Sequence, residues 1–237
     1  MVAIFGHDMR EARPMKKTSK SLFEKSKVEV SRSELQQFIK VNEQRRDEDN
    51  PEFRDFQTGP RVFLAAIRHP PIINSQNLCY GRTDMPLVQN WRDSLQTLRD
   101  NIKDLHFDKV ICSPAERCRT LLKALELKHL PTNFDKRLLE INFGSWEGKA
   151  WTTIDRLSVD RWIARPQDFC EHGGETFNQL CSRVYELAKE ESDNRTLLIT
   201  HSGVLKALSK IILKEKNPYW LKFEFSKLYF FNKPIAD

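Results

Sequence analysis

Short apolar runs separated by longer amphipathic stretches dominate the chain from residue 61 onward. Residues 62–67 (VFLAAI), 109–113 (KVICS) and 195–200 (RTLLIT) are short and almost without polar alternation. Such runs are typical of strands buried on both faces of a sheet. Because longer helical patterns separate these strands, the sequence predicts βαβ crossovers and a mainly parallel sheet.

The amphipathic stretches predict four helices, which cover residues 90–102, the segment that Pro114 opens, residues 175–189 and residues 204–213. Residues 133–165 are expected to form an irregular excursion over one end of the sheet. Residues 223–231 alternate as an edge strand does. The predicted fold is α/β, with three layers (α/β/α) and a mainly parallel central sheet that carries an antiparallel edge strand.

The first 60 residues differ from the rest of the chain. They are rich in charged residues and poor in apolar ones, with a single amphipathic helix predicted at 31–46 and a Gly59-Pro60 boundary. We expect residues 1–60 to be a charged, partly disordered extension and residues 61–237 to be one folded domain. The alternative is a docking arm or a dimerisation element, and the latter would make the protein a homodimer.

Composition narrows the class of protein. The net charge of +6 suits a small anionic substrate, and no block of Lys and Arg is long enough to favour nucleic acid. The five cysteines form no CxxC pair and no zinc-type spacing. Neither a secretory signal nor an apolar run of 18 residues is present. We therefore expect a cytoplasmic protein with reduced thiols, no metal or other cofactor and no membrane partner.

Basic and imidazole side chains follow the predicted strands. Arg68 and His69 end the first strand, His201 follows the third, and Arg117 lies one helical turn beyond the second. The carboxyl ends of parallel strands share one edge, where open α/β sheets bind ligands. Arginine matches phosphate oxygens, and a neutral imidazole can attack phosphorus. The sequence therefore predicts a phosphoryl-transfer site at this edge.

Five motifs in order resemble those of the histidine phosphatase superfamily: Arg68-His69, 113–117 (SPAER), 139–148 (LEINFGSWEG), 173–176 (GGET) and 200–203 (THSG). Residues 79–87 (CYGRTDMPL) resemble the α-ribazole phosphatase-like branch of that superfamily. The resemblance implies a phosphoglycerate mutase-like fold and an enzyme that hydrolyses phosphomonoesters through a phosphohistidine.

The resemblance also implies residue roles. His69 would be the phosphorylated nucleophile, while Arg68, Arg117 and His201 would hold the phosphoryl oxygens. Glu140 would donate a proton to the leaving group and later act as the base for water, and Glu147 is the rival acid.

Substrate binding is expected to involve Tyr80, Gly81, Arg82 and Ser202. The remaining histidines match no motif and are expected at the surface or in loops: His7, His106, His129 and His172.

Four positions near the expected site depart from the superfamily pattern. Pro70 stands where the superfamily usually has Gly, so a backbone N–H is missing beside the nucleophile. Ser202 stands where many relatives have Gly. Ile72 and Ser75 likewise replace the usual Thr and Asn, which weighs against a phosphoglycerate mutase.

The substrate that the resemblance favours is a small phosphorylated metabolite, with α-ribazole 5′-phosphate as the first candidate. A phosphatase of broad or different specificity, acting on protein or sugar phosphates, is an alternative on the same fold. A phosphate-binding pseudophosphatase with an N-terminal partner arm is the non-enzymatic alternative.

Overall fold

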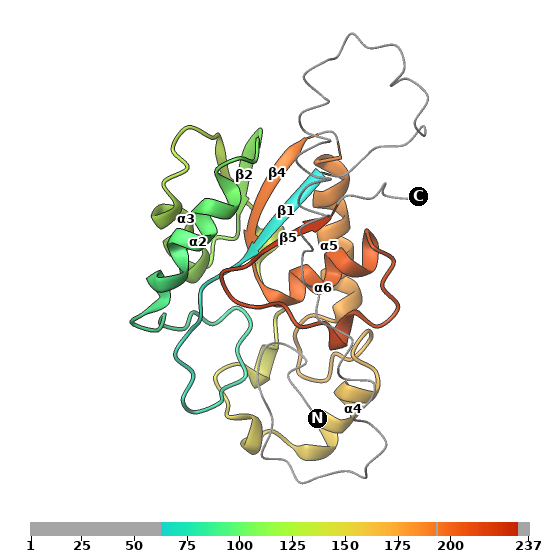
Figure 1. Ribbon diagram of the computed structural model, residues 1–237. Helices are drawn as coiled ribbons and strands as arrows, with labels where there is room; N and C mark the ends of the chain where they lie inside the picture. Colours follow the sequence, from blue (N-terminus) through green and yellow to red (C-terminus); the bar gives the residue numbers. More distant parts are fainter. Residues whose placement is uncertain (1–62, 193, 232–237) are drawn as a thin grey trace, which may run out of the picture.

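The computed structural model describes residues 63–192 and 194–231 (Figure 1). The predicted extension at 1–60, its helix at 31–46 and the first residue of the predicted strand at 62–67 lie outside the described residues.

Five strands form one sheet in the order β3-β2-β4-β1-β5. β1 (Phe63–Arg68) pairs in parallel with β4 (Arg195–Thr200), β4 with β2 (Lys109–Cys112), and β2 with β3 (Thr132–Phe134). β5 (Leu228–Phe231) runs antiparallel to β1 at the other edge. The mainly parallel sheet and its antiparallel edge strand are confirmed. β3 was not predicted because its three residues are all exposed and leave no hydrophobic signal.

Helices cover both faces of this sheet, as the three-layer prediction requires (Figure 1). They are α2 (Leu95–Ile102) and α3 (Glu116–Leu125) on one face, and α5 (Phe177–Glu190) and α6 (Ser202–Ile211) on the other. In β1, Ala65 and Ile67 pack in the core beneath α2 and α3, whereas Leu64 and Ala66 pack beneath α5 and α6. Since both faces of β1 are buried, its sequence shows no polar alternation.

Helix starts differ from the predictions in two places that matter for the site. Pro114 does not open α3: the helix begins at Glu116, and Ala115 is its N-cap. α6 begins at Ser202 rather than at 204, with His201 as its N-cap residue. The ends of β2 and β4 are therefore followed almost at once by the first turns of α3 and α6.

The expectation of a wholly irregular segment at 133–165 was wrong. It contains α4 (Arg156–Ala164), whose N-cap Asp155 accepts a hydrogen bond from the amide of Ser158. Only Val159 and Trp162 of α4 are buried, which is too few for a recognisable period. Short 3-10 helices complete the fold: η2 (Trp91–Ser94), η3 (Lys136–Leu138), η4 (Gly144–Trp146), η5 (Trp151–Thr153) and η6 (Pro218–Trp220).

An aromatic cluster holds this excursion against the end of the sheet. The Trp162 ring makes T-shaped contacts with Phe143 and Trp146, at centroid distances of 5.8 and 5.9 Å. His172 lies in a loop as expected but not at the surface: it is buried against Trp146 and Phe169, and its Nδ1 accepts the amide N–H of Gly174. Burial lowers the pKa of His172, so the uncharged ring serves as part of the aromatic core.

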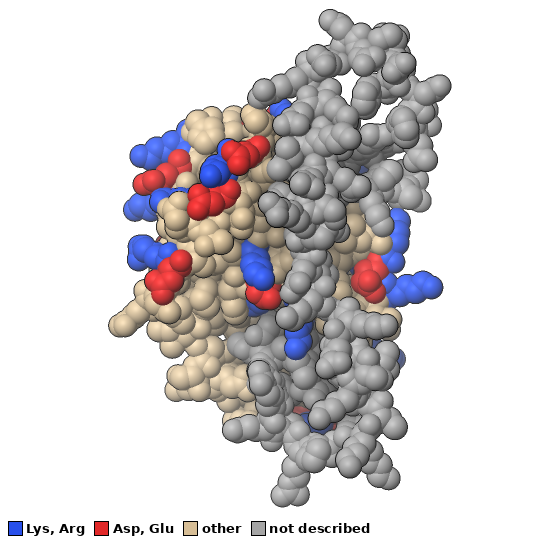
Figure 2. All heavy atoms as spheres, in the orientation of Figure 1, with Lys and Arg blue, Asp and Glu red and all other residues tan. Residues whose placement is uncertain are grey.

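Charges on the face seen in Figure 2 are mixed: Lys and Arg side chains alternate with Asp and Glu instead of gathering into one patch. Ion pairs such as Arg99 with Glu126 and Lys103 with Asp100 lie on α2 and at the end of α3. Four cysteines are buried and Cys170 is exposed, all as free thiols. Among the described residues, no helix is long and apolar enough to cross a membrane.

Candidate active site

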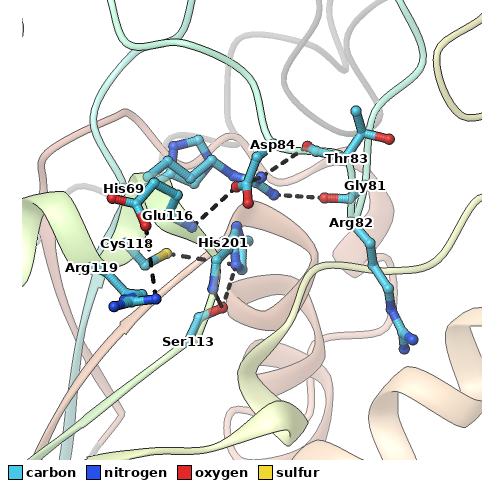
Figure 3. A network of polar contacts seen from close by, with 12 residues as sticks. His69, Gly81, Arg82, Thr83, Asp84, Ser113, Glu116, Cys118, Arg119 and His201 are labelled. Carbon is cyan, nitrogen blue, oxygen red and sulfur yellow. Dashed lines mark hydrogen bonds and ion pairs between the residues drawn. The ribbon is translucent and has the colours of Figure 1, made fainter.

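β1 and β4 end side by side, and this brings the two motif histidines together (Figure 3). The register places Arg68 beside Thr200, and the amide of His69 donates to the carbonyl of Thr200 at 2.9 Å. The rings of His69 and His201 lie 5.2 Å apart between centroids. Both side chains are buried, so the predicted convergence at this sheet edge is present in the structure.

The hydrogen bond of His69 decides which ring nitrogen is available. Its Nδ1 lies 2.7 Å from the carbonyl oxygen of Pro70, and a carbonyl can only accept, so Nδ1 carries the proton. Burial, together with Arg68 and Arg117, holds the pKa of His69 well below its usual range. The ring is therefore neutral with a free lone pair on Nε2, which is the form that can act as a nucleophile. Pro70 lacks an N–H but supplies this acceptor.

Arg68 is fixed on several sides. Its Nη1 donates to the carbonyl of Phe223 at 2.6 Å, and it forms a hydrogen bond with the Tyr80 side chain. The ring of Phe225 lies 3.6 Å from the guanidinium carbon. A planar, always charged group held in this way loses little conformational entropy when it binds an anion.

Arg117 ties the loop after β1 to the first turn of α3. It donates to the carbonyls of Gly81 (2.6 Å) and Thr83 (3.0 Å) and to the Asp84 carboxylate (3.1 Å). Its side chain is fully buried while Asp84 is half exposed. The loop and the arginine therefore position one another.

Three buried nitrogens around His69 have no partner among the described residues. They are Nε of Arg68, Nε of Arg117 and Nδ1 of His201. An unpaired buried polar group costs about 1–3 kcal/mol, so three such nitrogens at one sheet edge, two of them arginine donors, mark a place built to receive a ligand. Two guanidinium donors and an imidazole suit the oxygens of a phosphoryl group.

The two candidate acids have different surroundings. Glu140 is buried, and its carboxyl oxygens accept the amides of Ile141 and Gly203, each at 3.0 Å. The contact with Gly203 places Glu140 against the first turn of α6. Gly203 is the residue after Ser202 and the second after His201.

Glu147 instead accepts the amides of Arg82, Thr83 and Phe143 and the hydroxyl of Thr83. Burial raises the pKa of Glu147, but these hydrogen bonds outweigh it and bring the pKa below its usual value. Since it joins the 81–83 loop to the 143 turn, Glu147 has a structural role, and Glu140 is the acid nearer to the histidines.

Of the four residues expected to bind substrate, three lie in the loop or helix turn at the site and one, Arg82, points away from it. Tyr80 is buried and bonded to Arg68, and a Cβ on Gly81 would lie 1.9 Å from the carbonyl oxygen of Ile141, so both shape the loop. Ser202 is buried in the first turn of α6. The structure does not bring the Arg82 side chain to the site: it points away from the histidines and lies 3.7 Å from Glu175 (Figure 3).

Sequence reasoning missed two residues near the site. Phe225 contacts Arg68 and lies 5.4 Å from the His69 ring, but it comes from the loop before β5 and matches no motif. Lys206 is fully buried in α6 and donates to the carbonyl of Tyr219; burial lowers its pKa to about 7 although Glu140 opposes this. The only signal for Lys206 in the sequence is its place among the apolar residues Val204, Leu205, Ala207 and Leu208.

An α/β fold with a neutral histidine among arginine donors defines a phosphoryl-transfer enzyme. Residues 64–229 match the model of the histidine phosphatase superfamily (branch 1), and the chain belongs to this family. It is 32% identical over 154 residues to the adenosylcobalamin/alpha-ribazole phosphatase of Salmonella typhimurium, which covers 61% of this chain and 76% of the relative. It is 27% identical over 185 residues to a broad-specificity phosphatase of Saccharomyces cerevisiae, with 73% and 76% coverage.

Solved structures agree on the fold. The alpha-ribazole phosphatase from Shigella flexneri superimposes with a TM-score of 0.62 at 23% identity, covering 73% of this chain and 96% of that one. A phosphoglycerate mutase from Bacillus anthracis gives 0.60 at 20% identity, with 75% and 93% coverage. The phosphoglycerate mutase-like fold is confirmed, and the family match together with the phosphatase relatives supports a phosphatase.

Proposed function

We propose that this chain hydrolyses a small phosphomonoester through a phosphohistidine on His69. The observation that carries the proposal is the combination of a neutral His69, with its Nε2 lone pair free, and three unpartnered buried nitrogens beside it.

In the first step, Nε2 of His69 attacks phosphorus, and the P–N bond forms as the P–O ester bond breaks. The N–H groups of Arg68, Arg117 and His201 face the charge that develops on the phosphoryl oxygens. Glu140 gives its proton to the leaving alkoxide.

In the second step, Glu140 takes a proton from water as the water oxygen attacks phosphorus. The P–N bond breaks, His69 is regenerated, and inorganic phosphate leaves. The net reaction converts one ester and one water into an alcohol and phosphate.

α-Ribazole 5′-phosphate is the first candidate substrate. The 79–87 stretch and the relative from Salmonella typhimurium, whose name includes alpha-ribazole phosphatase, support it. A broad-specificity phosphatase is the second candidate, because the Saccharomyces cerevisiae relative covers more of this chain. A pseudophosphatase is disfavoured, since His69, Arg68, Arg117, Glu140 and His201 are all present.

The test combines rapid quenching with a substrate panel. Full-length protein mixed with ³²P-labelled substrate and quenched in alkali should hold label on His69. His69→Ala should lose both label and p-nitrophenyl phosphate hydrolysis, while His129→Ala, an exposed histidine, should match the wild type. A panel of α-ribazole 5′-phosphate, sugar phosphates and phosphopeptides then ranks kcat/KM. Turnover that persists in His69→Ala would refute the mechanism; equal kcat/KM across the panel would favour broad specificity.

A further inference from the structure

Ser113 makes a contact with His201 that the proposed reaction does not yet use. Its Oγ lies 2.8 Å from Nε2 of His201, and the Ser113 side chain is fully buried at the end of β2 (Figure 3). On the opposite side of the ring, Nδ1 is buried with no partner in the part of the chain that the structure describes. The protonation of the His201 ring therefore depends on the contacts at Nε2, of which the one to Ser113 is the shorter.

The neighbours of Ser113 indicate that direction. The amide of Ala115 donates to Oγ at 3.4 Å, so the hydroxyl oxygen already accepts one hydrogen bond. The other polar side chain near Nε2 is Cys118, with its Sγ at 3.6 Å from Nε2 and also 3.6 Å from the carbonyl of Thr200.

Burial raises the pKa of Cys118 well above its usual value, so it stays a thiol, which is both a weak donor and a weak acceptor. The strongest acceptor within reach of the Ser113 hydroxyl is then Nε2 of His201.

If the hydrogen bond ran in the opposite direction, from His201 to Ser113, His201 could not donate to a phosphoryl oxygen. If Nε2–H donated to Ser113, the Nδ1 lone pair would face the anionic phosphoryl group and repel it. Protonating both nitrogens is opposed by burial and by Arg117 and His69, which together hold the pKa of His201 well below its usual range.

We propose that Ser113 is a positioning residue: its hydroxyl donates to Nε2 of His201 and fixes the neutral ring in the Nδ1–H form, with that N–H directed at the phosphoryl oxygens. His69 is protonated on Nδ1 by a different device, the Pro70 carbonyl, and keeps Nε2 as its reactive atom. Two neighbouring imidazoles are thus committed to different tasks, one as nucleophile and one as hydrogen-bond donor. The task of His201 rests on the proposed function, but its protonated nitrogen is a property of the resting protein.

The test is nitrogen NMR on ring-¹⁵N-histidine protein at neutral pH, without substrate. The chain has six histidines, and the His201→Gln variant assigns the signals of His201 by their loss. The expected result is a protonated Nδ1 and an unprotonated Nε2. In Ser113→Ala the ring should become a mixture of both forms, and kcat should fall about 100-fold, whereas Ser113→Thr should restore both. Cys118→Ala should leave the protonated nitrogen of His201 unchanged.

Protonation of Nε2 in the wild type would overturn the proposal. So would an unchanged ring in Ser113→Ala, or a change produced by Cys118→Ala in place of Ser113→Ala. If the Nδ1–H form is found but no phosphohistidine can be trapped, the proposed function fails and the assignment of Ser113 stands.

Discussion

Gly203 in the first turn of α6 donates its amide to Glu140, and adding one methyl group at this position tests the role of that acid. A Cβ on Gly203 would lie 2.1 Å from Oε1 of Glu140 and 3.1 Å from its carboxyl carbon, whereas ordinary contacts begin near 3.4 Å. In the Gly203→Ala variant, the carboxyl group of Glu140 must therefore move by more than an ångström.

The free energy of this change is small enough for the variant to fold. Overpacking costs about 1–3 kcal/mol, and replacing Gly by Ala in a helix returns up to about 1 kcal/mol. A net loss of about 0–3 kcal/mol leaves most of the stability of a typical domain. Displacing a general acid–base group, in contrast, costs about 10²- to 10⁴-fold in rate.

The assay compares an alkyl phosphate with p-nitrophenyl phosphate. The alkyl leaving group needs the proton of Glu140, so its kcat should fall by about 10²- to 10⁴-fold. The nitrophenolate leaving group needs little acid, so it should leave in a rapid burst, followed by slow hydrolysis of an accumulated phosphohistidine. Unchanged kcat for both substrates, or equal losses without a burst, would refute the role given to Glu140.

Two further variants act as controls. Glu140→Gln should reproduce the burst kinetics without the added methyl group. Combining Gly203→Ala with Glu140→Asp shortens the acid by one methylene and should relieve the crowding, so the two changes should show favourable coupling in urea unfolding. Additive free energies of unfolding would show that the methyl group and the carboxyl group do not meet.

The remaining predictions concern Glu147 and Arg117, which hydrogen-bond the loop at 81–84, and the three buried histidines. Glu147→Ala leaves three backbone amides without their acceptor, so the free energy of unfolding in urea should fall by roughly 2–4 kcal/mol. Arg117→Lys replaces a fork that spans two carbonyls and a carboxylate, and kcat/KM should fall about 10²-fold while the thermal transition is retained. The pKa values of His69, His172 and His201 are lowered in the folded chain. Between those values and the ordinary 6.5 the unfolded chain binds more protons. Stability should therefore drop as pH falls below about 6.5, by up to about 1.4 kcal/mol per pH unit for each ring, and a urea midpoint independent of pH in this range would contradict the burial of all three.

The hydrophobic pattern predicted the strands that matter most because they are buried on both faces. β1, β2 and β4 appear within a residue or two of their expected ranges. β3 and α4 were not predicted. All three residues of β3 are exposed and only two side chains of α4 are buried, so neither segment shows a hydrophobic periodicity.

The sequence also determined which residues converge. Parallel strands share a carboxyl edge, so placing Arg68, His69 and His201 at strand ends was enough to bring them together. Arg117 was expected there from its place one helical turn beyond the second strand. The family motifs assigned Glu140 to the same site, and the structure places Glu140 against the first turn of α6, next to His201.

The tertiary structure decided what each converging group can do. Contacts between residues far apart in the chain give Glu140 and Glu147 different surroundings. Such contacts also bury His172 and direct the Arg82 side chain away from the site. Spacing along a sequence reports which side of a local element is buried, but a side chain's hydrogen-bond partner depends on how separate elements pack. For that reason the sequence could predict His201 as a site residue. Only the folded chain shows that the hydroxyl of Ser113, 88 residues away, lies within hydrogen-bond distance of its Nε2.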